Sequence, residues 1–66
     1  MTDEISYVKL KLLTKWLNDL ANEIEENKTL SNEELVSLLM SMKNIMTDIN
    51  TEIEIIMREL TQNKKA

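Results

Sequence analysis

Carboxylates are the residues of this 66-residue chain whose spacing comes closest to a chemical site. Glu23 with Glu26, and Asp48 with Glu52, stand three and four residues apart, which places each pair on one side of a helix. Such pairs bind metal ions between the helices of carboxylate-bridged bundles, where a Glu-x-x-His motif completes the site. The chain has no His, and we expect both pairs on the solvated sides of their helices. The spacing therefore predicts no metal centre.

The composition argues against most other chemistry. Without Cys or His, the chain lacks thiol nucleophiles, His-based acid–base catalysis and the usual ligands of zinc, iron–sulfur clusters, haem and copper. Without Gly, it cannot form a Gly-rich loop that binds phosphate. The remaining Ser, Thr, Tyr, Lys and carboxylate groups fall on long predicted helices with no cleft to desolvate them. We therefore expect no enzymatic activity and no cofactor.

Hydrophobic residues, 42% of the chain, recur at helical spacing. In a first predicted helix, about residues 3–26, one stripe follows steps of three and four and is typical of a coiled coil: Leu10, Leu13, Leu17, Leu20 and Ile24. A second stripe runs beside it: Ile5, Val8, Leu12 and Trp16. Together the stripes cover roughly 200° of the helix, more than one neighbour can bury. This helix should therefore contact at least two others.

A break in the middle of the chain predicts a turn at about residues 27–31. Ser31 and Glu34 form a capping box, and Leu30 with Leu35 forms a hydrophobic staple, so a second helix should begin at Asn32. Asn27 can supply a left-handed residue to this glycine-free turn. The second helix should run to about residue 61, followed by a frayed tail at 62–66. Its predicted seam is Leu35, Leu39, Met42, Met46, Ile49, Ile53, Ile56 and Leu60. Leu38 and Ile45 should widen this seam in its first half, and Met57 in its second half.

Two such helices predict an all-α fold, a single-domain antiparallel helical hairpin over residues 1–66. A lone hairpin would leave part of its hydrophobic surface in water, and we predict that this part is a self-interface: Ile5, Val8, Leu12, Trp16, Ile56, Met57 and Leu60. Trp16 is expected to anchor either this self-interface or a contact between the first helix and a different protein. Burying half of that surface would stabilise each chain by about 5–10 kcal/mol. We therefore expect a homodimer in which two hairpins form a four-helix bundle.

Five further residues are candidates for binding another protein. Lys9 lies on the apolar face of the first helix, where it either sets register or partner choice, or covers apolar surface with its stem. Val36 and Met40, one turn apart and off the seam, predict a small exposed patch. Glu23 and Glu26 belong to an acidic segment between residues 23 and 34 that could dock a basic protein surface.

The charge balance disfavours nucleic acid and membrane partners. The net charge is −4, from 8 basic and 12 acidic residues. Lys11 and Lys15, one turn apart, are the candidates for contacts with nucleic-acid phosphates. The first residues, Met-Thr-Asp-Glu, are acidic where a signal peptide is basic, and no apolar run exceeds three residues, so we expect a cytoplasmic protein with no membrane partner.

The leading functional hypothesis is a small homodimeric interaction module that acts as an adaptor, inhibitor or regulatory accessory factor. The abundance of Lys, Asn, Ile and Glu without Gly or Pro is typical of AT-rich genomes, such as those of low-GC bacteria and their phage. One alternative is a regulatory four-helix dimer that binds nucleic acid. Another is a structural or assembly subunit that pairs with a different chain.

Overall fold

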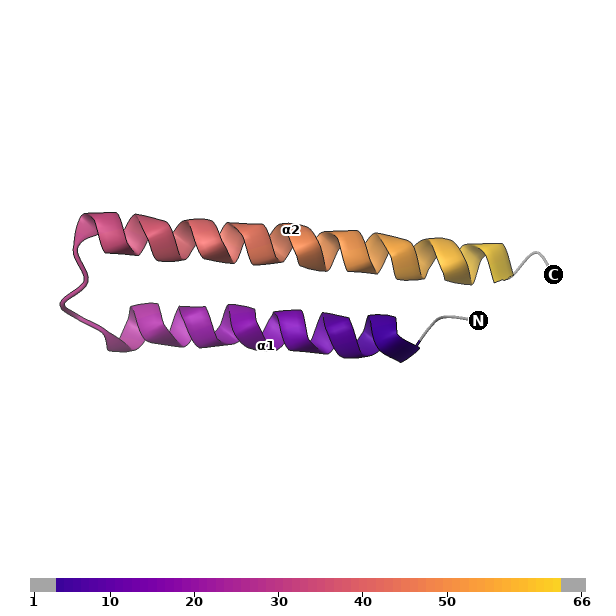
Figure 1. Ribbon diagram of the computed structural model, residues 1–66, viewed down its shortest axis with the longest axis horizontal. Coiled ribbons are helices and arrows are strands. Elements are labelled where there is room, and N and C mark those ends of the chain that lie inside the picture. Colours follow the sequence, from indigo (N-terminus) through magenta and orange to yellow (C-terminus); the bar gives the residue numbers. More distant parts are fainter. Residues whose placement is uncertain (1–3, 64–66) are drawn as a thin grey trace.

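A computed structural model describes residues 4–63 of the chain as an antiparallel pair of helices (Figure 1). Helix α1 spans Glu4–Glu26 and helix α2 spans Asn32–Asn63. They pack side by side, with the connection at one end of the hairpin and the start of α1 and the end of α2 at the other. The hairpin measures 55 × 16 × 12 Å along its principal axes. The predicted all-α helical hairpin is confirmed.

The connection between the helices has the predicted capping box. The backbone N–H of Ser31 donates to Glu34 Oε1 at 2.9 Å, and the backbone N–H of Glu34 donates to Ser31 Oγ at 3.1 Å. Asn27 turns the chain differently from the prediction, because no described non-Gly residue has a positive φ. Instead its Oδ1 accepts hydrogen bonds from the backbone N–H and the hydroxyl of Thr29, at 3.2 and 2.9 Å. An Asx-type turn therefore replaces the left-handed residue.

Helix α2 ends two residues later than predicted. Gln62 and Asn63 are helical, whereas the prediction placed them in a frayed tail; residues 64–66 of that tail lie outside the described part of the chain. Neither residue is Pro or Gly, so the backbone meets no steric reason to stop at 61. The hydroxyl of Thr61 also donates to the carbonyl of Met57 at 2.8 Å, within this last stretch.

The seam between the helices is the predicted one in α1 and only partly the predicted one in α2. Leu10, Leu13, Leu17, Leu20 and Ile24 are all buried or half-buried. In α2 the inward residues follow steps of three, then four: Leu35, Leu38, Met42, Ile45, Ile49, Glu52, Ile56 and Glu59. The prediction that Leu39, Met46, Ile53 and Leu60 belong to this seam is wrong, because all four are exposed.

Two competing lines of residues explain that error. Both candidate seams share Leu35, Met42, Ile49 and Ile56. The two candidate seams differ at their other four positions. The first line is Leu38, Ile45, Glu52 and Glu59, and the second line is Leu39, Met46, Ile53 and Leu60. The second line is apolar throughout, whereas the first ends in two glutamates, so hydrophobicity favoured the second. Helix α1 packs against the first line and leaves the fully apolar line in contact with solvent.

Candidate interaction surfaces

Helix α2 carries an uninterrupted apolar line outside the hairpin seam. Leu39, Met46, Ile53 and Leu60 repeat every seven residues and are between 39% and 56% exposed. We name these four residues the α2 stripe. A seven-residue repeat keeps one direction along a supercoiled helix, so the stripe is a nearly straight line about 32 Å long. Val36 and Met57, which are also exposed, lie beside its two ends.

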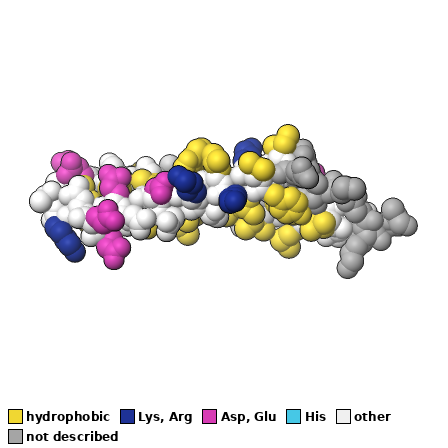
Figure 2. All heavy atoms as spheres, turned by 90° about the horizontal axis from the view of Figure 1, so that it is seen from below, with side chains coloured by type: hydrophobic (Ala, Val, Ile, Leu, Met, Phe, Trp, Pro, Cys, Tyr) yellow, Lys and Arg dark blue, Asp and Glu magenta, His cyan; other side chains and the backbone are white. Residues whose placement is uncertain are grey.

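Helix α1 carries a second apolar surface near its N-terminal end. Ile5, Val8, Leu12 and Trp16 are all exposed, Ile5 to 70% and Trp16 to 47%. Figure 2, which views the hairpin from the α1 side, shows hydrophobic side chains over the half away from the connection and acidic side chains toward the connection. We name Ile5, Leu12 and Trp16, with Ile55 of α2, the tryptophan patch.

The α2 stripe and the tryptophan patch lie on opposite broad faces of the hairpin. Lys9 and Asp48 line one hollow between the helices and so mark one face. Trp16 follows Lys9 by seven residues, and Ile55 follows Asp48 by seven, so both lie on that same face. The α2 stripe flanks the seam on the other side of α2 from Asp48. Each broad face therefore has an apolar surface of its own.

The seven residues predicted as a self-interface do not form one surface. Ile56 is 7% exposed and belongs to the hairpin seam. Leu60 is part of the α2 stripe and Met57 lies beside it, on the face opposite Trp16. Val8 lies on the outer edge of α1, between the two faces, where it lines a hollow with Lys11, Leu12, Thr14 and Lys15. The periodicity of a single helix could not reveal this division, because it depends on which line of α2 meets α1.

Lys9 bridges the two helices. Its Nζ lies 3.3 Å from Glu52 Oε2, with side-chain exposures of 63% for Lys9 and 10% for Glu52. The expectation that Glu52 lies on a solvated side is wrong, because the residue is 7% exposed overall. Its position follows Leu38 and Ile45 at seven-residue steps, which is the signal that could have placed it inward. The Lys9 side chain thus supplies a cation to a carboxylate in the seam.

The next residue of the same line is also acidic. Glu59 is half-buried, and its Oε1 is buried without a hydrogen-bond partner. Unsatisfied buried polar atoms lower stability. The half of the seam away from the connection is therefore less apolar than the half beside it, where Leu35 and Leu38 face α1.

The other candidate partner-binding residues are spread over the end of the hairpin beside the connection. Glu23 lines a hollow there with Leu30, Glu33, Glu34, Ser37 and Leu38. Glu26 is exposed at the end of α1. Val36 and Met40, 54% and 60% exposed, point away from the seam on α2.

The backbone N–H and then the hydroxyl of Ser31 lower the pKa of Glu34 below its ordinary value of 4.5.

The candidate nucleic-acid residues form a weak basic site. Lys15 Nζ lies 3.4 Å from Asp19 Oδ2, one turn along α1, so a neighbouring carboxylate offsets part of its charge. Lys11 is exposed and lines the outer hollow of α1 with Val8, Leu12 and Thr14. Two lysines, one of them paired, offer few contacts to a phosphate backbone.

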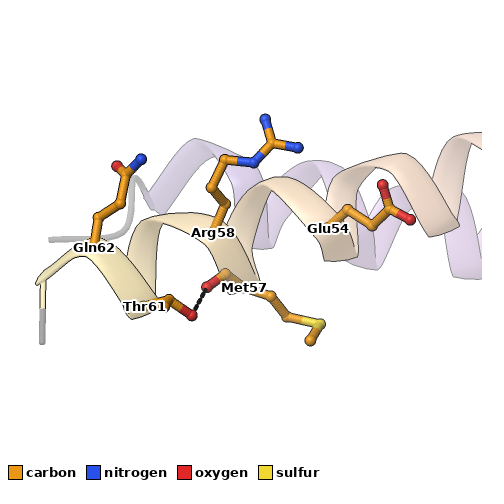
Figure 3. Close-up of a pocket in the computed structure, with 5 residues that line it drawn as sticks. All are labelled: Glu54, Met57, Arg58, Thr61 and Gln62. Carbon is orange, nitrogen blue, oxygen red and sulfur yellow. Dashed lines mark hydrogen bonds between the residues drawn. The ribbon is translucent and has the colours of Figure 1, made fainter.

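Another hollow lies near the end of α2, and its described lining residues all belong to that helix. Its lining is Glu54, Met57, Arg58, Thr61 and Gln62 (Figure 3). Arg58 and Gln62 point to one side of the helix and Met57 to the other, so these side chains do not converge on a shared point. This hollow is a shallow surface between neighbouring side chains, without the enclosed walls of a ligand site.

Comparison of the chain with protein-family models, with curated proteins and with solved structures finds no match in any of the three. Within residues 4–63, no group of three or more acidic side chains is arranged to hold a metal ion. Over the same residues, neither helix has an apolar stretch long enough to cross a membrane.

Proposed function

We propose that this chain is a small non-enzymatic homodimer, built as a four-helix bundle, that acts by binding another protein as an adaptor, inhibitor or regulatory accessory factor. The observation that carries the proposal is the pair of apolar surfaces on opposite broad faces of one hairpin. Two helices have a single seam between them, so they cannot bury either surface by themselves.

The exposed area supports association. The chain exposes 5533 Å², about 1,200 Å² more than the roughly 4,300 Å² expected for a compact monomer of its mass. Among the described residues, the hydrophobic core consists of Leu13 and Ile56, which are 6% and 7% exposed. A core of so few buried side chains gives little stability to a chain of this size, and small proteins often gain stability by forming oligomers. A second hairpin on one face would supply the missing core.

The other face is then available for a different protein. In this proposal the tryptophan patch is the anchor, since exposed Trp side chains often contribute much of the binding energy at interfaces. Acidic side chains lie further along α1, toward the connection (Figure 2). The matching partner segment is an amphipathic helix whose apolar residues are followed by basic ones.

Selection of peptides from a display library tests this second half of the proposal. We expect the intact chain to enrich amphipathic sequences with basic residues at one end, and Trp16→Asp to lose them. Met40→Asp is the matched control, because it places the same charge on an exposed apolar position of α2 outside both the tryptophan patch and the α2 stripe. Equal enrichment by the intact chain and Trp16→Asp would contradict the proposed binding face.

A further inference from the structure

We infer that the second copy docks on the α2 stripe with the two α2 helices antiparallel and the two connections at opposite ends of the bundle. This inference rests on the proposed homodimer and specifies its surface and its symmetry. It places a two-fold axis across α2 midway along the stripe, level with Ile49 and Asn50.

The stripe is complementary to its own reversed copy. A two-fold axis between Met46 and Ile53 places Leu39 opposite Leu60 of the partner subunit, and Met46 opposite Ile53 of the partner subunit. Each level of the contact is then apolar on both sides, as a symmetric dimer interface requires. The exposed Val36 and Met57 beside the two ends of the stripe add to the apolar area.

Charge also favours the antiparallel arrangement. Five exposed acidic residues lie at the connection end with a single base, Lys28: Glu23, Glu25, Glu26, Glu33 and Glu34. Hairpins stacked in the same direction would place both acidic ends together. The antiparallel arrangement separates them by most of the length of the bundle, well beyond the screening length of about 8 Å at physiological ionic strength. It also keeps Lys43, beside the stripe, about 20 Å from Lys43 of the partner subunit.

The opposite face is a poorer site for a second copy. The ion pair of Lys9 with Glu52 and the carboxylate of Asp48 lie beside the tryptophan patch. Docking there would remove charges from water, which costs free energy unless each is paired again. The α2 stripe contains no charged side chain, and the charged residue that lies beside it on α2 is Lys43.

Disulfide trapping tests the symmetry directly, because the chain has no Cys of its own. We expect a mixture of Leu39→Cys and Leu60→Cys chains to form a cross-linked dimer under mild oxidation. Each variant alone should give little product, since its two thiols would lie about 30 Å apart, far beyond disulfide reach. Trp16→Cys, on the opposite face, is the control and should not cross-link.

The outcomes separate this inference from the proposed homodimer. Efficient cross-linking of Leu39→Cys with itself, or of Trp16→Cys with itself, in a chain that sediments as a dimer would overturn the inferred surface or symmetry and leave the homodimer standing. A chain that sediments as a monomer would overturn both. In the dimer, acrylamide should also quench Trp16 to the extent that its 47% exposure in the single hairpin allows. Near-complete protection would place Trp16 in the dimer interface and contradict the inference.

Discussion

Two reciprocal hydrogen bonds at Ser31 and Glu34 define where α2 begins. Each satisfies a backbone N–H that the first turn of a helix would otherwise leave without a partner. Both residues were assigned from sequence, because a capping box depends on residues three positions apart and on nothing distant. Glu52 is the opposite case, since only the packing of α1 against α2 decides that its carboxylate is buried.

Loss of the cap should destabilise the hairpin without changing its fold. Ser31→Ala removes the acceptor for the Glu34 N–H, and we expect it to lower the free energy of unfolding by about 1 kcal/mol. Urea denaturation followed by circular dichroism measures this change. Ser37→Ala, at an exposed position in the second turn of α2, is the control and should have little effect.

Glu34 should make stability depend on pH in acid. Its pKa is lower in the folded chain than the ordinary value of 4.5, because the Ser31 N–H and hydroxyl favour the charged form. The stabilisation is therefore present above pH 4.5 and is lost as the pH falls through the lower folded value. Glu34→Gln should reduce the loss of thermal stability on acidification below pH 4.5. Glu33→Gln removes the same charge without that bond; an equal effect from it would contradict this account.

The buried carboxylate in the seam should be unfavourable for stability. Glu52→Leu extends the apolar seam and removes a buried charge that the exposed Lys9 pairs. We expect it to raise the free energy of unfolding by about 1–2 kcal/mol. Glu54→Leu, the same substitution on the exposed side of α2, is the control for helix propensity. A thermal midpoint that falls in Glu52→Leu would show that the Lys9–Glu52 pair stabilises the hairpin.

At the scale of the elements, the sequence predicts the two helices and their direction but not the pairing line on α2. The α1 seam was correct because one line of that helix is rich in leucine. Helix α2 has two adjacent lines that are both apolar near the connection, represented by Leu38 and Leu39. Periodicity within one helix gives the direction of each line, and only contact with α1 selects between them.

Two isoleucines three residues apart test that assignment. Ile56 is 7% exposed in the seam and Ile53 is 39% exposed in the α2 stripe. Ile56→Ala should destabilise the hairpin by about 2–4 kcal/mol at every protein concentration, because it leaves a cavity. Ile53→Ala should instead weaken association. On dilution, the helicity of this variant should therefore begin to fall at a higher protein concentration than the helicity of the unmodified chain. Denaturation at several concentrations distinguishes the two, and identical behaviour of both variants would contradict the assignment.

At the scale of the whole molecule, the hairpin is a slab 12 Å thick at its narrowest with an apolar surface on each broad face. The sequence predicted that exposed hydrophobic residues would remain, since a two-helix chain has too few neighbours to cover them. The sequence alone assigns these hydrophobic residues to one interface, because it does not specify which rows of side chains on the two helices share a face of the hairpin. Because the two surfaces are separate, we propose that the α2 stripe binds a second copy of the chain and that the tryptophan patch binds another protein.

Sedimentation equilibrium of the unmodified chain, from micromolar to nanomolar concentration, tests the central claim most directly. The account predicts a dimer, with twice the 7.7 kDa mass of the chain, that dissociates only on dilution. A chain that remains a monomer throughout, at the higher concentrations as well, would contradict it.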